Sequence, residues 1–422
     1  MKQTEIGLIP DDWEVNRIGN VSEIFGRIGF RGYTVEDLVD EGFGAITLSP
    51  SNIQNGRMDF SNCSYISWKK YDESPEIKIA NGDILLVKTG STYGKSAIVK
   101  NLTKKATINP QFVVIKKTKC NNELLGYLIQ TPTVQEQIEA SIVGGAIPTL
   151  SQKQIASFKI PLSKSLAEQQ RIAKALSDVD ALISTTEKLL QKKQNIKQGT
   201  MQNLLTGKKR LPGFGPQTKF PAYKQTELGK IPEDWEVKSF DELFDICTET
   251  ISVDSIKKES YIGTENMLQD KMGVIKNETE LNYLKVREYR KQDILVSNIR
   301  PYLKKIWFAD KNGGCSTDVL VFRKKRNSDN ADFLFKIVSD DRFFNIVNDN
   351  AVGTKMPRGD KNIIKQVLFA IPTTKEEQTA IAIVLSSMDK EIETLNTKLE
   401  KYRNLKTAMM QQLLTGKIRL VK

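Results

Sequence analysis

The chain has 422 residues, which is room for about two or three domains of ordinary size. Hydrophobic residues (39%) and charged residues (27%) are near globular averages, which excludes a disordered or fibrous chain. The 63 Lys and Arg against 51 Asp and Glu give a formal net charge of +12, which favours a polyanionic partner such as nucleic acid.

The chain contains no histidine. Catalysis by Ser-His-Asp or Cys-His groups, histidine general bases and histidine metal ligands are therefore excluded for this chain acting alone. The four cysteines, Cys63, Cys120, Cys247 and Cys315, form no C-x-x-C pair, which indicates reduced thiols and neither a zinc knuckle nor a small disulfide framework. We expect no bound metal.

The apolar runs are short. The longest, 84–87 and 319–322, have the length of a strand and not of a membrane span, and the N-terminus lacks a long apolar core. We expect a soluble protein of the cytoplasm.

The chain is an internal repeat. Residues 2–15 recur at 224–237 with 11 of 14 positions identical, and residues 204–211 recur at 413–420 with 7 of 8 identical. The offset falls from 222 to 209 between these matches, so the second copy is 13 residues shorter inside. The ends of the two copies agree, whereas their interiors differ.

Each copy begins with a strand-rich part and ends with a helix. Short β-type runs such as 82–88, 111–115 and 319–322 alternate with Gly, Asn and Pro turns, which predicts a mixed globular domain in each copy. The predicted class is α+β. The sequence places the first domain at 1–160, its helix at 161–211, a linker at 212–227, the second domain at 228–372 and the second helix at 373–422.

Each helix is predicted to begin at a capping box, Ser165-x-x-Glu168 or Thr374-x-x-Glu377. Gly207 and Gly416 are suitable left-handed C-caps, so the helices should cover 166–206 and 375–415. Isolated helices of this length, roughly 60 Å, need a partner.

Both helices carry a heptad pattern. It places these apolar residues on a coiled-coil and partner-docking face: Leu176, Ile183, Leu190, Leu204, Leu385, Ile392, Leu399 and Leu413. We expect the two helices to pack antiparallel about a pseudo-two-fold axis; the alternative is that each lies on its own domain. Lys197 and Lys406 interrupt the pattern, and we expect them to snorkel to the surface rather than set the register.

Three motifs look catalytic without meeting the requirements. Residues 89–96 resemble a phosphate loop, but Thr89 stands where the first glycine is required. Asn109-Pro110-Gln111-Phe112 lacks the second proline of the DNA amino-methyltransferase signature, and the Glu236-x-Lys238 of the second copy has no lysine in the first. Trp13 and Trp235 are better interpreted as packing anchors.

The repeated motifs resemble the specificity subunit of type I restriction-modification systems. They are L-G-x-I-P-x-D-W-E-V at the start of each half, E-Q-x-x-I-A-x-x-L-S-x-x-D at 168–180 and 377–389, and L-L-T-G-K-x-R-L at the end. The resemblance implies two target recognition domains, each reading one half of a bipartite double-stranded DNA site, held apart by two antiparallel helices.

The same resemblance implies partners and cofactors. The helices would dock two methyltransferase subunits carrying S-adenosylmethionine, and two restriction subunits would use ATP and Mg²⁺. This chain would carry no catalytic residue and bind no cofactor itself.

Basic and aromatic residues in the turn-rich segments are the natural DNA contacts. We predict these positions: Arg27, Arg31, Lys88, Ser91, Thr92, Tyr93, Lys95, Arg300, Tyr302, Lys304, Lys305, Lys355 and Arg358. The uncharged loop 144–150 of the first copy matches the loop around Lys355 and could contact groove walls through its backbone.

Two other functions stay open. One is a self-contained enzyme that depends on Lys95 or Glu236. The other is a stand-alone two-domain DNA-binding or coiled-coil scaffold protein without a restriction partner.

Overall fold

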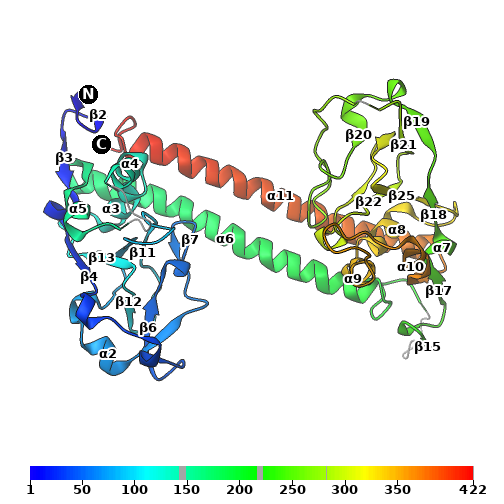
Figure 1. Ribbon diagram of the computed structural model, residues 1–422, viewed down its shortest axis with the longest axis horizontal. Coiled ribbons are helices and arrows are strands. Elements are labelled where there is room, and N and C mark those ends of the chain that lie inside the picture. Colours follow the sequence, from blue (N-terminus) through cyan, green and yellow to red (C-terminus); the bar gives the residue numbers. More distant parts are fainter. Residues whose placement is uncertain (142–148, 216–221, 282, 422) are drawn as a thin grey trace. The chain divides into compact units, whose positions relative to one another are not determined.

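The computed structural model describes residues 1–141, 149–215, 222–281 and 283–421. The chain divides into two compact units. Unit 1 consists of residues 1–187 and 397–422, and unit 2 of residues 188–396. Unit 1 is thus built from both ends of the chain, and each unit holds a strand-rich domain and a part of both long helices (Figure 1).

The strands of unit 1 are β1 (Lys2–Thr4), β2 (Gly7–Ile9), β3 (Trp13–Arg17), β4 (Glu23–Gly26), β5 (Leu38–Val39), β6 (Gly44–Leu48), β7 (Ile53–Gln54), β8 (Arg57–Met58), β9 (Ser64–Ser67), β10 (Ile84–Val87), β11 (Ser96–Ile98), β12 (Ala106–Ile108), β13 (Phe112–Lys116) and β14 (Lys159–Ser163). Its short helices are α1 (Ile18–Val21), α2 (Trp68–Asp72), α3 (Asn122–Ile129), α4 (Pro132–Ala140) and α5 (Gln152–Ser157). Its 3-10 turns are Gly29–Arg31, Val35–Asp37, Pro50–Asn52 and Pro75–Ile77.

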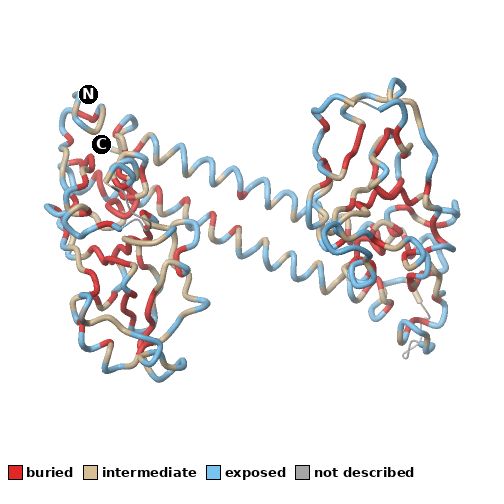
Figure 2. Tube along the Cα trace, in the orientation of Figure 1, coloured by how far each residue is buried: buried red, intermediate tan, exposed pale blue. Residues whose placement is uncertain are grey.

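The central sheet of unit 1 has the order β4-β13-β10-β11-β8-β7 and is buried on both faces. Along β10, Ile84 and Leu86 join the core that contains α3 and α4, whereas Leu85 and Val87 join the core beneath the sheet β12-β6-β9-β5. An apolar run without alternation is what a strand covered on both sides requires. Figure 2 shows these buried stretches inside the unit.

The strands of unit 2 are β15 (Tyr223–Thr226), β16 (Gly229–Pro232), β17 (Trp235–Ser239), β18 (Phe244–Cys247), β19 (Thr250–Ser252), β20 (Tyr261–Ile262), β21 (Lys285–Tyr289), β22 (Ile294–Ser297), β23 (Ile306–Phe308), β24 (Gly313–Cys315), β25 (Val319–Lys324) and β26 (Leu368–Pro372). Its short helices are α7 (Phe240–Leu243), α8 (Ala331–Val338), α9 (Asp341–Asp349) and α10 (Lys361–Gln366), and its 3-10 turns are Val253–Ser255, Lys258–Ser260 and Pro301–Leu303. Strand β15 lies within the segment 212–227 that the sequence analysis assigns to a linker.

The two domains share four strands of the central sheet, to which unit 1 adds β8 and β7, and they differ in the second sheet. The order β18-β25-β22-β23 repeats β4-β13-β10-β11, with the same antiparallel pairing. In unit 1 the strand β9 pairs with β6, but in unit 2 the strand β21 pairs with β24. The shorter interior of the second copy is therefore built differently beyond the central sheet.

The long helices are α6 (Leu166–Leu204) and α11 (Lys375–Leu413). Each ends two residues earlier than predicted. The predicted C-caps are confirmed, since Gly207 and Gly416 have φ angles of +69° and +68°. Within unit 1, Asp180 pairs with Lys406 and Glu187 with Arg403, so the helices run antiparallel there.

The same direction holds within unit 2, where Lys193 of α6 pairs with Glu391 of α11. Leu204 and Leu385 belong to one core, which also includes the aromatic residues of the domain. The alternative that each helix lies only on its own domain is therefore wrong.

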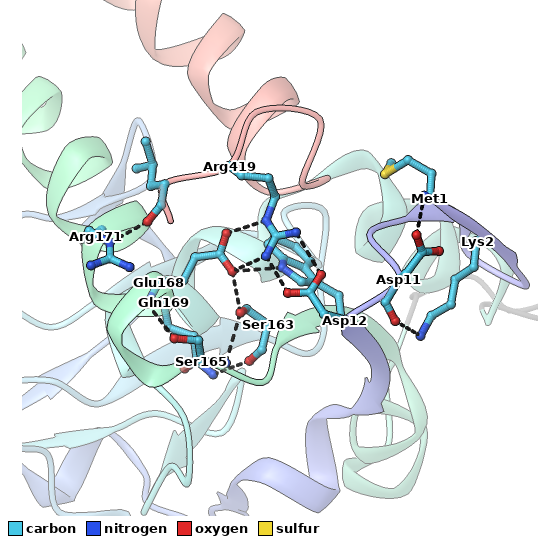
Figure 3. A network of polar contacts seen from close by, with 12 residues as sticks. Met1, Lys2, Asp11, Asp12, Ser163, Ser165, Glu168, Gln169, Arg171 and Arg419 are labelled. Atoms are coloured by element: carbon cyan, nitrogen blue, oxygen red, sulfur yellow. Dashed lines mark hydrogen bonds and ion pairs between the residues drawn. The ribbon is translucent and has the colours of Figure 1, made fainter. Parts of the chain in front are cut away.

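A buried carboxylate fastens the end of the chain to the first domain (Figure 3). Glu168, fully buried at the start of α6, accepts hydrogen bonds from Trp13 Nε1 (3.1 Å) and Ser163 Oγ (2.6 Å). Arg419 Nε donates to Glu168 Oε1 at 2.6 Å, and its two terminal nitrogens reach Asp12 at 2.8 and 2.7 Å. The predicted capping box is thus only half formed, because the Glu168 side chain points to these partners and not back to the cap.

Unit 2 repeats this arrangement. Glu377 accepts from Trp235 Nε1 at 3.2 Å and from Arg210 Nη2 at 2.6 Å, and Arg210 also contacts Asp234 at 2.8 Å. Both tryptophans are 1% exposed, as expected of packing anchors. We call Glu168 with Arg419, and Glu377 with Arg210, the two latches.

The aspartate that ends the shared helix motif is a second fastening point. Asp180 accepts from Tyr127 Oη at 2.7 Å and contacts Lys406 Nζ at 2.9 Å and Arg57 Nη2 at 3.0 Å. Burial opposes ionisation of Asp180, but Lys406, Tyr127 and Arg57 outweigh it and hold its pKa below the usual value. Asp389 contacts Lys336 at 2.6 Å and also pairs with Lys197.

The prediction that Lys197 and Lys406 snorkel is therefore wrong. The Lys406 side chain is 15% exposed and its ammonium lies 5.5 Å from the Tyr127 ring centroid. Each lysine of the heptad seam meets a carboxylate of the other long helix at the same level, and such a pair favours one register.

The three motifs with a catalytic appearance form ordinary structure. Residues 89–95 connect two antiparallel strands, so no helix N-terminus is presented to a phosphate. Asn109 closes a turn by accepting from Gln111 N at 3.0 Å, and Glu236 pairs with Lys238 at 2.9 Å along β17. No helix in the described part of the chain combines the length and apolarity that a membrane span needs.

Candidate nucleic-acid interface

Two loops of unit 2 join to form a basic surface. The loop 298–305 follows β22, and the loop 352–359 connects α9 to α10. Arg300 N donates to Pro357 O at 2.7 Å and Gly359 N to Asn298 O at 3.1 Å. We call residues 298–305 and 352–359 the basic loop pair.

The exposed side chains of the basic loop pair are cationic, aromatic or apolar. Arg300 and Lys355 are exposed, the Arg358 side chain is 57% exposed and Tyr302 is 51% exposed. Val352 (68%) and Met356 (51%) lie on the same loops. Cations for phosphates and flat or apolar groups for bases and sugars are the residue types that a DNA-reading surface combines.

Two predicted lysines of this surface are already bound within the protein. Lys304 Nζ contacts Asp341 at 2.7 Å, and Lys305 Nζ donates to Thr264 O at 2.8 Å. Lys271 also contacts Asp341, at 2.8 Å. Burial raises the pKa of Asp341, but the two lysines outweigh it and lower the pKa, so one ionised carboxylate faces two ammonium groups and positive charge remains.

The backbone of the loop 298–305 is strained. Arg300 and Lys304 have φ angles of +52° and +49°, in the left-handed region that residues other than glycine rarely adopt. Within the described residues, the buried Oδ1 of Asn298 has no hydrogen-bond partner. Strain of this kind, on the order of 1–3 kcal/mol for each residue, persists where the surrounding structure enforces it and is concentrated at functional sites.

The corresponding loop of unit 1, residues 88–95, is a hairpin turn between β10 and β11. Gly90 and Gly94 have φ angles of +99° and +80°, which the turn requires. Thr89 bridges to Thr149, and Leu150 N donates to Lys88 O at 2.7 Å. The segment before Thr149, which the sequence analysis matched to the loop around Lys355, lies outside the described residues.

The predicted residues of this turn differ in accessibility. Ser91 and Lys95 are exposed, whereas Thr92, Tyr93 and Lys88 are half-buried. Burial lowers the pKa of the Lys88 ammonium. Ser91 and Lys95 are the predicted residues of the turn that solvent reaches most freely.

The prediction for Arg27 is not supported, because Arg27 is 5% exposed. Its guanidinium donates to Ile108 O, Thr107 Oγ1 and Arg31 O, each at 3.2 Å, and lies 5.3 Å from the Tyr33 ring centroid. Arg31 is more accessible and pairs with Glu76 at 3.7 Å. Loop position alone suggested Arg27, but its hydrogen-bonding groups are used to hold unit 1 together.

The heptad residues predicted for partner docking face inward. Leu176, Ile183, Leu204, Leu385, Leu399 and Leu413 are at most 5% exposed, and Leu190 and Ile392 are half-buried. They pack within the chain. Three apolar residues seven positions apart on α6 are exposed: Leu182 (45%), Leu189 (40%) and Ile196 (43%).

Most of the excess positive charge lies outside the strand-rich domains. Residues 166–211 hold nine Lys and Arg against four Asp and Glu, and residues 374–422 hold nine against six. Eight of the twelve net charges therefore belong to the helices and the segments that follow them. This local excess of Lys and Arg can be counted in the sequence, but the total net charge alone does not reveal where it lies.

A family model described as the type I restriction modification DNA specificity domain matches the chain twice, over residues 10–198 and 232–401. Both matches include a strand-rich domain and most of the helix that follows it.

Named relatives are similar along nearly the whole chain. The chain is 29% identical to the specificity subunit of the type I restriction enzyme MjaVIII from Methanocaldococcus jannaschii, over 98% of this chain and 94% of that protein. It is 21% identical to the EcoDI specificity subunit of Escherichia coli, over 98% and 90%. The crystal structure of a type I restriction-modification S subunit from M. genitalium shares the fold, with a TM-score of 0.59, 14% identity and 98% of both chains covered.

Proposed function

Because the chain belongs to the type I restriction-modification DNA specificity family, we propose that it is the subunit that reads DNA sequence in such a complex. Each domain reads one half of a bipartite target, and the long helices set the gap between the halves and dock methyltransferase subunits.

The observation that carries this proposal is a repeated frame with different loops. Both domains keep the same order of four strands in the central sheet and the same latch, in which Trp13 and Trp235 have equivalent partners. The loops at the end of β10 and β22 differ in charge and backbone conformation. Two domains that recognise different half-sites need this combination. The shared structure must present the same surface to identical partner subunits, while the loops contact different bases.

The chain itself has no catalytic role in this proposal. Lys95 lies in a hairpin turn, and Glu236 forms an ion pair on a strand. The methyl group would come from S-adenosylmethionine on two methyltransferase subunits, and ATP and Mg²⁺ would act on two restriction subunits, all in the cytoplasm. The exposed row Leu182, Leu189 and Ile196, in place of the buried heptad residues, is the face of α6 that remains for a partner helix.

The test is single-molecule methylome sequencing of a host that lacks its own DNA methylation. One strain expresses this chain with its genomic methyltransferase partner, and the other expresses the partner alone. A methylated motif in two parts with a fixed gap, seen only when the chain is present, is the expected result.

Replacement of residues 16–160 by the same region of a relative should change one half of that motif and leave the other half unchanged. Methylation in the absence of the chain, or an assembled complex that methylates no motif, would instead support a scaffold protein.

A further inference from the structure

The backbone of Arg358 is held from two sides. Its N–H donates to Val352 O and its carbonyl accepts from Val352 N, both at 2.9 Å, which closes the loop 352–359. A bridge to Ile299 joins it to the end of β22. The starting point of the Arg358 side chain is therefore fixed, unlike that of a cation on an open loop.

The guanidinium of Arg358 is also oriented. Nη2 lies 2.9 Å from Asp318 Oδ1, while the Arg358 side chain remains 57% exposed. Asp318 is itself fixed, because its carbonyl accepts from Asn298 N at 2.8 Å and its N–H donates to Ser316 Oγ at 3.3 Å. An exposed ion pair contributes little to stability, so its main effect here is on the direction of the guanidinium.

The other donors of this guanidinium are left for another acceptor. In the described part of the chain, Asp318 is its one polar partner, and the Nε and Nη1 donors are not used. Nη2 carries two N–H groups, and the one that does not meet Asp318 lies parallel to an N–H of either Nε or Nη1. Such a parallel pair matches the O6 and N7 acceptors of guanine, which is the usual bidentate contact of arginine in the major groove.

The carboxylate distinguishes a base from a phosphate as the ligand. A phosphate approaching Arg358 would meet the negative charge of Asp318 at short range, whereas the edge of a guanine carries no net charge. Lys355 and Arg300 differ in this respect, because they are exposed and no carboxylate of the described residues lies within 4 Å of their charged groups. These two cations fit phosphates.

We propose that Arg358, oriented by Asp318, reads a guanine in the half-site of the second domain, and that Lys355 beside it contacts the DNA backbone. The proposal rests on the proposed function and assigns the side chain that sets specificity at one base.

The experiment uses the complete complex with its methyltransferase partner and compares wild type with Arg358→Ala, Arg358→Lys, Asp318→Asn and Lys355→Ala. Methylome sequencing gives the motif, and fluorescence anisotropy gives affinity for duplexes that differ at the guanine. Arg358→Ala and Arg358→Lys should lower discrimination at one position by about 5- to 150-fold, because a bidentate contact contributes about 1–3 kcal/mol of discrimination. Asp318→Asn should lower it less.

Two control variants separate recognition of a base from electrostatic attraction to the DNA phosphates. Lys355→Ala should weaken binding to all duplexes alike, leave the motif unchanged and reduce the slope of log K against log salt by about 1. Arg290→Ala should change neither motif nor affinity. Arg290 precedes β22, at the end opposite the basic loop pair, and it too is an exposed arginine (53%) paired with carboxylates.

A uniform loss of affinity in Arg358→Ala, with the motif unchanged, would overturn the proposal and make Arg358 a phosphate contact. So would a second half-site without a guanine on either strand. Circular dichroism of each variant identifies a folding defect, and Arg358→Lys then decides, since it keeps the charge but loses the bidentate geometry. If the wild-type complex methylates no motif in two parts, the proposed function fails, and this proposal fails with it.

Discussion

The guanidinium of Arg419 lies 2.6 Å from the buried carboxylate of Glu168, which precedes it by 251 residues. Arg210 has the same relation to Glu377 across 167 residues. The segment after each long helix thus completes the latch of the domain that belongs to the other copy. This exchange explains why the short L-L-T-G-K-x-R-L motif is repeated with so little change.

Loss of a latch arginine should destabilise its unit. Arg419→Ala leaves Glu168 buried without its cation, so we expect the free energy of unfolding to fall by about 3 kcal/mol. Urea unfolding followed by circular dichroism measures this fall. Arg403→Ala is the control, because Arg403 is 45% exposed and its loss should cost less than about 1 kcal/mol. Equal effects of the two substitutions would contradict the latch.

Gly207, the left-handed cap after the end of α6, should not tolerate a side chain. A Cβ on Gly207 would lie 2.4 Å from Pro232 Cδ, and the φ angle is +69°. We expect Gly207→Ala to lower the melting temperature and to cost about 2–4 kcal/mol. Gly199→Ala, within α6 and with nothing within 4 Å of the added carbon, should instead stabilise by about 0.5–1 kcal/mol. Destabilisation by both would show that the helix, and not the Pro232 contact, is sensitive.

Acid should weaken unit 1 through Asp180. The pKa of this carboxyl is lowered in the folded protein, so the unfolded chain binds more protons in acid. The stability contributed by the ionised carboxylate is complete above about pH 5 and is lost as the pH falls through about 4 and below. The difference in unfolding free energy between wild type and Asp180→Asn should therefore shrink from pH 7 to pH 3. Asp178→Asn, at an exposed position (59%) on the same helix, is the control substitution.

Substitutions of Arg27 and Lys95 should have different effects, the first on folding stability and the second on DNA binding. Arg27→Ala removes three hydrogen bonds, two of them to buried groups, and we expect a loss of about 2–4 kcal/mol in unfolding free energy. Lys95→Ala should leave the unfolding free energy within about 0.5 kcal/mol and weaken DNA binding of the complex at low salt. A stable Arg27→Ala variant with weakened DNA binding would restore the original prediction for that residue.

The sequence predicted the long helices well because their signals are local. Capping residues, a heptad row and a terminal glycine lie within a few residues of the features they specify, and Gly207 and Gly416 have the predicted left-handed conformation. The strand-rich class also followed from local patterns. The strand order of the second sheet did not, since pairing β21 with β24 or β9 with β6 depends on contacts between distant segments.

The roles of charged residues were the hardest to predict. Lys406 has the appearance of a surface lysine until Asp180 is placed beside it, and Arg27 has the appearance of a DNA contact until Ile108 and Thr107 surround it. Asp318 gave no signal at all, because its importance lies in one contact to a residue 40 positions later. Such partnerships are properties of the tertiary structure.

Unit 2 is one continuous stretch of chain, whereas unit 1 needs residues 397–422 to complete its core and latch. A ribosome releases residues in order from the N-terminus. Unit 1 can therefore be completed only after residues 397–422 emerge, when all residues of unit 2 have already been made. During synthesis Glu168 therefore has Trp13 and Ser163 as partners before its cation Arg419 is made, and residues 397–422 complete unit 1.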